Sequence, residues 1–222
     1  MRMRKKKNGA QRIAACSHLL VPSPEALAAP ELLFDADRPL HLEIGCGKGN
    51  FACGMAEKHP DVNFIAMERV SDVCCVALEK AVQRATERPH DNLRFMIGDA
   101  KLLGDCMKPA SVSCLYLNFS DPWPKKGHAK RRLTHASFLA IYRRLLTPDG
   151  VIKLKTDNEG LFASSLEQFE LCGMEILYRT DDLHASPLAE GNVMTEYEKN
   201  FSDKGMPIHA VHARFRPEEN TL

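Results

Sequence analysis

Short apolar segments alternate with amphipathic segments along almost the whole of this 222-residue chain. The apolar segments have the length and composition of β-strands and cover residues 40–44, 63–67, 93–97, 112–119, 151–155, 175–178 and 209–215. Helix-like stretches between them cover residues 51–58, 71–87, 134–146 and 161–171. Such alternation predicts a parallel, doubly wound α/β sheet with helices on both faces.

The chain has the length of one domain, residues 1–222, and shows no internal repeat or low-complexity linker. Its two least regular parts are residues 1–35 and 181–205. We expect the first to be a basic N-terminal extension and the second to be a long active-site loop. Ser71 and Thr134 are the predicted N-caps of two helices, and T-P-D-G at residues 147–150 predicts a turn.

Composition narrows the possible partners and compartments. The net charge is only +1, but basic residues cluster at residues 2–7 and 125–132, the usual electrostatic footprint of a phosphate backbone. No apolar run approaches the roughly 20 residues that span a bilayer, and no signal-peptide core follows the basic start, so a cytoplasmic location is expected. The eight cysteines form no C-x-x-C pair, which predicts buried thiols and no metal site.

Ligands of doubly wound sheets bind at the carboxyl ends of the strands. The first strand runs into L-E-I-G-C-G-K-G, whose glycines permit a tight turn and close approach of a ligand. The spacing differs from the G-x-G-x-x-G of dinucleotide-binding proteins. Glu43 inside the strand end would repel a pyrophosphate and suits the positive end of an amino-acid-like ligand. This tilts the interpretation from a dinucleotide towards S-adenosylmethionine, with Gly45, Gly47 and Gly49 forming the turn.

The next two strands also end in acids. Glu68, after the second strand, has two oxygens that can accept from both hydroxyls of a ribose. Asp99, followed by Ala100 after the third strand, can accept from an adenine amino group. L-E-I-G-C-G-K-G, A-M-E-R and I-G-D-A together resemble class I S-adenosylmethionine-dependent methyltransferases. The resemblance implies a Rossmann-like seven-stranded sheet, mostly parallel, with the last strand antiparallel.

The fourth strand leads into F-S-D-P-W-P-K-K-G-H-A-K-R-R-L, where two prolines stiffen the turn. Amino-methylating enzymes that act on nucleic acids carry a different D/N-P-P-aromatic turn at this place. The longer string is similar to the tRNA (guanine-N7)-methyltransferase family, which modifies guanine 46 in the tRNA variable loop. K-L-K-T-D-N at residues 153–158 and T-E-Y-E-K at residues 195–199 extend the resemblance along almost the whole chain.

The resemblance implies a role for each matching residue. Asp121 is the implied catalytic residue, and it also lies close to the cofactor. The implied cofactor-binding residues are Glu43, Gly45, Gly47, Gly49, Glu68, Asp99, Ala100 and Asp121. The implied substrate-binding residues are Lys125, Asp157, Thr195, Glu196, Tyr197 and Glu198. The implied RNA-binding residues are Gly127, His128, Ala129, Lys130, Arg131 and Arg132.

The chemistry of guanine N7 agrees with this site, because N7 is a lone-pair acceptor with no proton to remove. Asp121 would either stabilise the positive charge that methylation leaves on the purine or hold the base by accepting from its N1–H and amino group. Trp123 would either pack under the turn, which the flanking prolines favour, or stack on a base. In both cases the expected cofactor is S-adenosylmethionine, with S-adenosylhomocysteine as its product.

Three alternatives stay open at this point. An amino-group methyltransferase on DNA or another RNA is disfavoured by the D-P-W-P spacing, and a dinucleotide-dependent oxidoreductase by the glycine spacing and Glu43. A non-catalytic tRNA-binding subunit would have no use for a cofactor pocket. The expected partner is tRNA, without a membrane and without an obligatory protein partner. The sequence leaves open whether the protein is a monomer or a homodimer, and which tRNAs it prefers.

Overall fold

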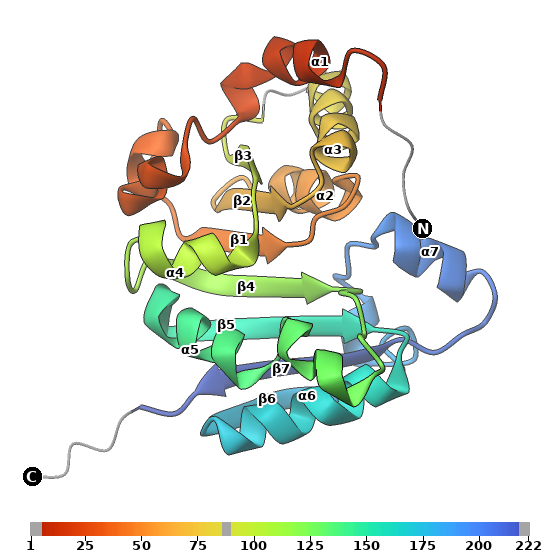
Figure 1. Cartoon of the computed structure of the whole chain (residues 1–222). Coiled ribbons are helices and arrows are strands. Elements are labelled where there is room, and N and C mark those ends of the chain that lie inside the picture. Colours follow the sequence, from red (N-terminus) through yellow and green to blue (C-terminus); the bar gives the residue numbers. More distant parts are fainter. Residues whose placement is uncertain (1–5, 86–89, 218–222) are drawn as a thin grey trace, which may run out of the picture.

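The computed structural model describes residues 6–85 and 90–217, and its centre is a seven-stranded sheet (Figure 1). The order of the strands across the sheet is β3-β2-β1-β4-β5-β7-β6. The strands are β1 (Leu40–Ile44), β2 (Asn63–Glu68), β3 (Leu93–Ile97), β4 (Val112–Asn118), β5 (Leu146–Thr156), β6 (Met174–Thr180) and β7 (His209–Phe215).

The sheet has the mixed direction expected from the sequence. Strands β1 to β5 pair in parallel, whereas β7 lies antiparallel between β5 and β6. The register places the ends of the parallel strands side by side: Ile44 pairs with Met67, and Glu68 pairs with Ile97. The predicted α/β sheet with an antiparallel last strand is therefore confirmed, and the loops that follow β1, β2, β3 and β4 share one edge.

Two hydrophobic clusters cover the two faces of the sheet. One contains side chains of α4, α5 and α6, the helices in front of the sheet in Figure 1, and the other contains side chains of α2 and α3. Fully burying a large apolar side chain such as Phe95 or Leu115 contributes about 1.5–3 kcal/mol. The helices are α1 (Gly9–Ala15), α2 (Asn50–Lys58), α3 (Ser71–Arg84), α4 (Leu103–Cys106), α5 (Ala136–Leu145), α6 (Glu159–Leu171) and α7 (Glu196–Ser202).

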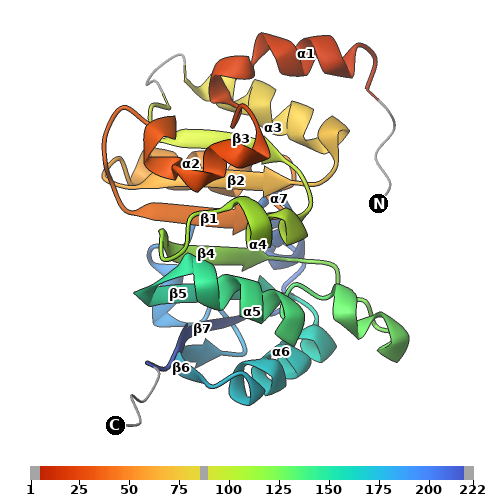
Figure 2. The ribbon, with the colours of Figure 1, turned by 60° about the vertical axis from the view of Figure 1, so that its left-hand side comes forward.

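The described part of the predicted N-terminal extension, residues 6–35, forms short helices that pack on the sheet. Helix α1 lies along α3 (Figure 2), and the Val21 amide donates to the Phe95 carbonyl of the edge strand β3 at 2.8 Å. Leu27, in the short helix η2 (Pro24–Ala28), is fully buried. The apolar side chains at 19, 21 and 27 therefore attach this segment to the sheet. Of the predicted basic start, Arg2, Arg4 and Lys5 lie outside the described residues.

Several local predictions were wrong. The helix α3 begins at Ser71 itself, and its N-cap is Val70, without a side-chain cap. His135, not Thr134, caps α5 by accepting from the Ser137 amide, because the Thr134 hydroxyl is buried and hydrogen-bonded to Ser165. The turn at residues 147–150 does not precede β5 but interrupts it, where the pairing with β4 jumps from Leu146 to Val151.

The segment 181–205 is not one irregular loop. It contains η6 (Pro187–Ala189) and the helix α7, which begins in a capping box: the Thr195 hydroxyl accepts from the Glu198 amide, and the Glu198 carboxylate accepts from the Thr195 amide. T-E-Y-E therefore has a structural meaning, the start of a helix, in addition to the function implied by resemblance.

The described residues contain no helix that is both long enough and apolar enough to cross a membrane. They also contain no cluster of three or more His, Cys, Asp or Glu side chains that could hold a metal ion. The eight cysteines are free thiols, of which Cys106 and Cys172 are half-buried and the other six are buried.

Candidate active site

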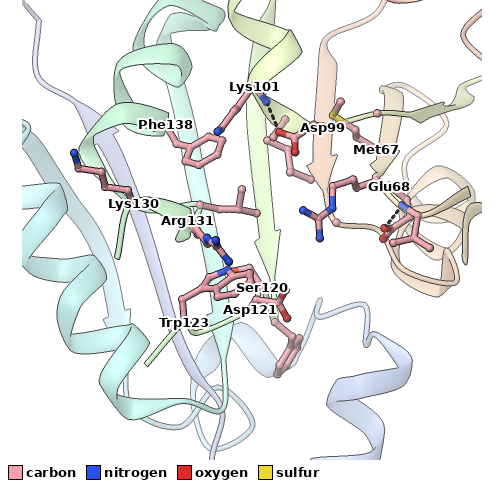
Figure 3. Close-up of a pocket in the computed structure, with 18 residues that line it drawn as sticks. Met67, Glu68, Asp99, Lys101, Ser120, Asp121, Trp123, Lys130, Arg131 and Phe138 are labelled. Carbon is pink, nitrogen blue, oxygen red and sulfur yellow. Dashed lines mark hydrogen bonds between the residues drawn. The ribbon is translucent and has the colours of Figure 1, made fainter. Parts of the chain in front are cut away.

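A cavity of about 530 Å³ opens at the carboxyl edge of the sheet, where the loops after β1, β2, β3 and β4 meet. Figure 3 shows Glu68 and Asp99 on one side of this cavity and Asp121, Trp123 and Arg131 on another. Of the residues predicted to bind the cofactor, Gly45, Glu68, Asp99, Ala100 and Asp121 line it, whereas Glu43, Gly47 and Gly49 do not. The structure thus brings together acids from three strand ends.

The glycine turn after β1 needs its glycines for two reasons. Gly45, Gly47 and Gly49 all have positive φ, at 82°, 57° and 79°, a region that side chains with a Cβ rarely adopt. A Cβ on Gly49 would also lie 2.9 Å from the Ala77 Cβ of α3. Gly49 therefore allows α2 to start close against α3. Gly45, at the start of the same turn, lines the cavity.

Glu68 is held by the same turn. Its two carboxylate oxygens accept hydrogen bonds from the Gly47 amide at 3.1 Å and from the Val70 amide at 2.8 Å. Two amides fix the orientation of the carboxylate, and each oxygen retains further acceptor capacity towards the cavity. Glu68 thus suits a ligand with two neighbouring hydroxyls.

Asp99 begins the short helix η4 (Ala100–Leu102) and accepts from the Lys101 amide at 3.0 Å through Oδ1. Ala100 is buried beside it and lines the cavity. Among the described residues Asp99 Oδ2 has no hydrogen-bond donor. This oxygen can accept a hydrogen bond from a ligand amino group.

Glu43 lies beneath the cavity and is only 3% exposed. Its Oε1 accepts from Asn118 Nδ2 at 2.9 Å, while Glu43 Oε2 and Asn118 Oδ1 are buried without a partner among the described residues. Burial raises the pKa of Glu43 to about 7, against the opposing effects of Asn118 and of the Lys155 charge. These two buried acceptors therefore lack a donor among the described residues, which a proton on Glu43 or a ligand cation would supply.

Replacing Glu43 with glutamine should change how stability depends on pH. The folded protein binds a proton on Glu43 between pH about 4.5 and 7 that the unfolded chain releases, so wild-type stability falls as pH rises through this window. The difference between the pKa of Glu43 in the unfolded chain, 4.5, and in the folded protein, about 7, corresponds to about 3 kcal/mol of stability. The free energy of unfolding of Glu43→Gln minus that of wild type should therefore grow by about this amount from pH 4 to pH 8, measured by denaturant titration. The exposed Glu190→Gln is the matched control; parallel curves for Glu43→Gln and wild type would contradict the assignment.

The turn after β4 holds Asp121 at the cavity in a strained backbone. Phe119 and Trp123, on either side of Asp121, have positive φ of 52° and 40°, which is unusual for such residues. The Arg132 guanidinium donates to the carbonyls of Pro122 and Trp123, both at 3.1 Å. Asp121 itself is exposed at the cavity wall. Arg132 therefore stabilises the turn, and this contact was not anticipated from the sequence.

Trp123 packs within the basic segment that follows. The Arg131 guanidinium lies 4.8 Å above its ring, and the His128 ring meets it edge-on at 5.7 Å. The segment forms the short helix η5 (Lys126–Arg131), which leaves Lys125, Gly127, Lys130 and Arg131 exposed and His128 and Ala129 half-buried. Trp123 also lines the cavity, so packing within the segment and stacking on a base both stay open as predictions, and the exposed cations Lys130 and Arg131 line the same cavity as Asp121.

The segment around Thr195 approaches the same edge from the second face of the sheet. Tyr197 is 47% exposed, and its ring contacts Phe119 at 5.1 Å and Phe201 at 4.5 Å. Burial, and secondarily the charge of Asp157, raise the pKa of Tyr197. Two other residues of the segment face inwards: Glu196 pairs with Lys80 of α3, and Glu198 pairs with Lys155 of β5.

Lys155 and Asn118 contact predicted site residues but were not themselves predicted from the sequence. Lys155 is a buried lysine near the end of β5, and Asn118 is the last residue of β4. The available sequence signal was the lysine in K-L-K-T at the end of a predicted strand. Lysine is almost never buried without a partner, so a buried position there would have implied a charged partner. Its partners lie about 40 residues away in sequence, so the pairing itself was not predictable.

The comparisons with known proteins agree with this geometry. The sequence model of a putative methyltransferase family matches residues 37–211. A tRNA (guanine-N(7)-)-methyltransferase of Listeria monocytogenes is 44% identical, over 97% of this chain and 99% of its own length. Relatives of the same description from Lactococcus lactis (42%, over 99% and 100%) and Brevibacillus brevis (49%, over 81% and 82%) are similar.

Solved structures show the same fold at low identity. The 16S rRNA methyltransferase KamB has a TM-score of 0.64 at 13% identity, over 86% of this chain and 94% of its own. An antibiotic-related methyltransferase has a TM-score of 0.59 at 15% identity, over 86% and 92%. The fold is thus the Rossmann-like methyltransferase fold, and because relatives at 42–49% identity span most of the sequence, the chain belongs to the tRNA (guanine-N7)-methyltransferase family.

Proposed function

We propose that this protein transfers a methyl group from S-adenosylmethionine to N7 of guanine 46 in the variable loop of tRNA. The observation that carries the proposal is the position of Asp121 at the wall of a cavity that also contains Glu68 and Asp99. The names of the relatives support tRNA and guanine N7, and the F-S-D-P-W-P-K-K string supports position 46 through its resemblance to the family.

The residues at the strand ends fit the parts of S-adenosylmethionine. The Glu68 carboxylate would accept from the two ribose hydroxyls, and Asp99 Oδ2 from the adenine amino group. Glu43 and Asn118 are buried and do not line the cavity, so the Glu43 carboxylate would act on the ammonium group of the methionine part through its charge, while Gly45 leaves space at the cavity wall. When bound, this cofactor supplies an electrophilic methyl group next to a positive sulfur.

The protein contributes position and charge to the reaction. Guanine N7 carries a lone pair and no proton, so no general base is required. Alignment of the base with the methyl group supplies most of the rate, and the strained turn braced by Arg132 keeps Asp121 fixed while this happens. The Asp121 carboxylate then faces the purine, either to stabilise its developing positive charge or to accept from its N1–H and amino group.

The exposed cations beside Asp121 suit the tRNA backbone. Lys125, Lys130 and Arg131 follow the turn directly and are exposed. Contacts from such residues to phosphates fix the register of the RNA without reading its sequence. The guanine must leave its stack to reach the cavity, so tRNA shape would set the selectivity. We expect tRNA affinity to fall steeply with salt.

Reversing one of these charges should separate tRNA binding from cofactor binding. Arg131→Glu should weaken tRNA binding about 10-fold and reduce the slope of log affinity against log salt by about 1 or more, because phosphate contacts release counterions. S-adenosylmethionine binding should stay within about twofold of wild type. Fluorescence anisotropy at several salt concentrations and calorimetry measure the two affinities. Lys108→Glu, which lies before β4 at the far edge of the sheet, is the control; an unchanged salt slope in Arg131→Glu would remove Arg131 from the tRNA contact.

A further inference from the structure

A buried lysine connects the central sheet to the segment that is proposed to bind the base. Lys155, near the end of β5, is 8% exposed. Its ammonium group donates to Asn192 Oδ1 at 3.0 Å, to the Val193 carbonyl at 3.1 Å and to Glu198 Oε2 at 2.8 Å. All three acceptors belong to residues 192–198, which we call the base segment. The three protons of one ammonium group therefore bind three points of one short stretch of chain.

The base segment has few other attachments to the sheet. Val193 packs against α2, where a Cβ on Gly54 would lie 2.7 Å from Val193 Cγ1, and just before the segment Lys58 donates to the Gly191 carbonyl at 2.7 Å. Glu196 pairs with Lys80 of α3. These contacts fix the segment to the helices, whereas Lys155 fixes it to the strand whose next residues are Thr156 and Asp157. Lys155 thereby sets the distance between the base segment and Asp157.

The carboxylate of Glu198 is fully occupied within the protein. Glu198 is 0% exposed. Its Oε2 accepts from Lys155 and, at 3.4 Å, from the Thr195 amide; its Oε1 accepts from Asn192 Nδ2 and lies 3.3 Å from His184 Nε2. Burial lowers the pKa of Lys155, and the charges of Glu198 and Glu43 oppose this effect. Neither oxygen of Glu198 is presented to the cavity.

We propose that Lys155 is a positioning residue for methyl transfer, and that Glu198 acts through Lys155 rather than by touching the guanine. The proposal rests on the proposed function, because it concerns the segment that would receive the target base. Tyr197, which is exposed and contacts Phe119 after β4, is then the residue of the base segment that faces the substrate. By binding Asn192, the Val193 carbonyl and Glu198, Lys155 keeps Tyr197 at a fixed position near the end of β5.

Removing one partner of this pair leaves the other charge buried and unpaired, so the base segment should detach. Lys155→Met keeps the length of the side chain and removes its charge. We expect the ratio kcat/KM for tRNA to fall about 100-fold, while S-adenosylmethionine binding changes by less than about threefold. Lys155→Arg retains the charge and the donors. It should recover at least about a third of the loss on a logarithmic scale, so that its kcat/KM falls by no more than about 20-fold.

Lys153→Met is the matched control for this measurement. Lys153 lies two residues earlier on β5 and on the same face, and its ammonium group is 5.8 Å from the Tyr116 ring. This variant removes a lysine from the same strand without a contact to the base segment, so its kcat/KM should stay near wild type. Equal losses in Lys153→Met and Lys155→Met, or an unchanged kcat/KM in Lys155→Met, would overturn the proposal. Wild-type transfer to tRNA in the same assay tests the proposed function separately.

Two double-mutant cycles test the role of Glu198. If Glu198 acts through Lys155, the variant Lys155→Met with Glu198→Met should be no less active than either single variant, because an apolar pair replaces a broken ion pair. Glu198→Met should lower activity by the same factor on tRNA that carries guanine and on tRNA that carries inosine, which lacks the 2-amino group, at the methylated position. If Glu198 instead bonds the guanine amino group, the inosine substitution should have no further effect in Glu198→Met, and the proposal is wrong.

Discussion

Asp121→Ala should lower the turnover of methyl transfer about 1000-fold, while S-adenosylmethionine still binds detectably. Removing one preorganised charge or hydrogen-bonding group beside a reacting centre costs about 100- to 1000-fold in rate, and Asp121 would supply both charge and acceptor capacity. The exposed carboxylate lies on a turn that Arg132 braces at two carbonyls, so truncation should leave the turn in place. Single-turnover kinetics with saturating tRNA measure the rate, and calorimetry measures cofactor binding.

Asp121→Asn separates the two roles that the carboxylate can have. The amide keeps the shape of the side chain but has no charge, and only one of its arms accepts hydrogen bonds. If Asp121 stabilises charge, the amide should be nearly as inactive as alanine; if it only positions the base, the amide should keep a measurable part of the rate and raise KM for tRNA. Asp105→Ala, an exposed acid on α4, controls for the loss of a surface charge. Turnover near wild type in Asp121→Ala would remove this residue from the mechanism.

Glu68→Ala should weaken S-adenosylmethionine binding about 1000-fold. Two hydrogen bonds from ribose hydroxyls to a carboxylate contribute about 1.5–3 kcal/mol each, and the alanine also leaves the Gly47 and Val70 amides without their acceptor. The affinity of the protein for tRNA should stay within about twofold, because the basic segment lies across the cavity from Glu68. Calorimetric titration with S-adenosylhomocysteine measures the loss without the complication of turnover.

Glu68→Gln distinguishes ribose binding from collapse of the glycine turn. The glutamine fills the same space and still accepts with one oxygen, so it should bind the cofactor more tightly than Glu68→Ala and more weakly than wild type. Thermal unfolding of both variants reports whether the turn is intact. Cofactor binding by Glu68→Ala at wild-type affinity would show that Glu68 does not face the ribose.

Much of the strand arrangement was predictable because its signals are local. Each parallel strand is a short apolar run, and the glycines at 45, 47 and 49 adopt the positive φ that their residue type permits. The acids Glu68 and Asp99 directly follow or end such runs, so predicting the strands also predicted their common edge. The same reasoning placed Asp121 at that edge, after β4.

What was missed depends on contacts between distant parts of the chain. From the sequence, Lys155 is only a polar residue near the end of a strand. Its partner Glu198 lies 43 residues later, so only the folded chain shows the pair. Arg132 reads as one more cation of a basic run, and only the folded turn shows that it donates to Pro122 and Trp123. Thr134 has the residue type of a cap, but its buried hydroxyl hydrogen-bonds to Ser165 of α6 instead.

The central claim is that this protein methylates N7 of guanine 46 in tRNA, and mapping the methylated position tests it most directly. Unmodified tRNA transcripts are incubated with wild-type protein and S-adenosylmethionine labelled in the methyl group, with a transcript that carries adenine at position 46 as the control. The account predicts one labelled nucleoside, 7-methylguanosine, located at position 46 by reduction and aniline cleavage, and no label in the control. Label on an exocyclic amino group, label retained in the control, or no transfer at all would contradict it.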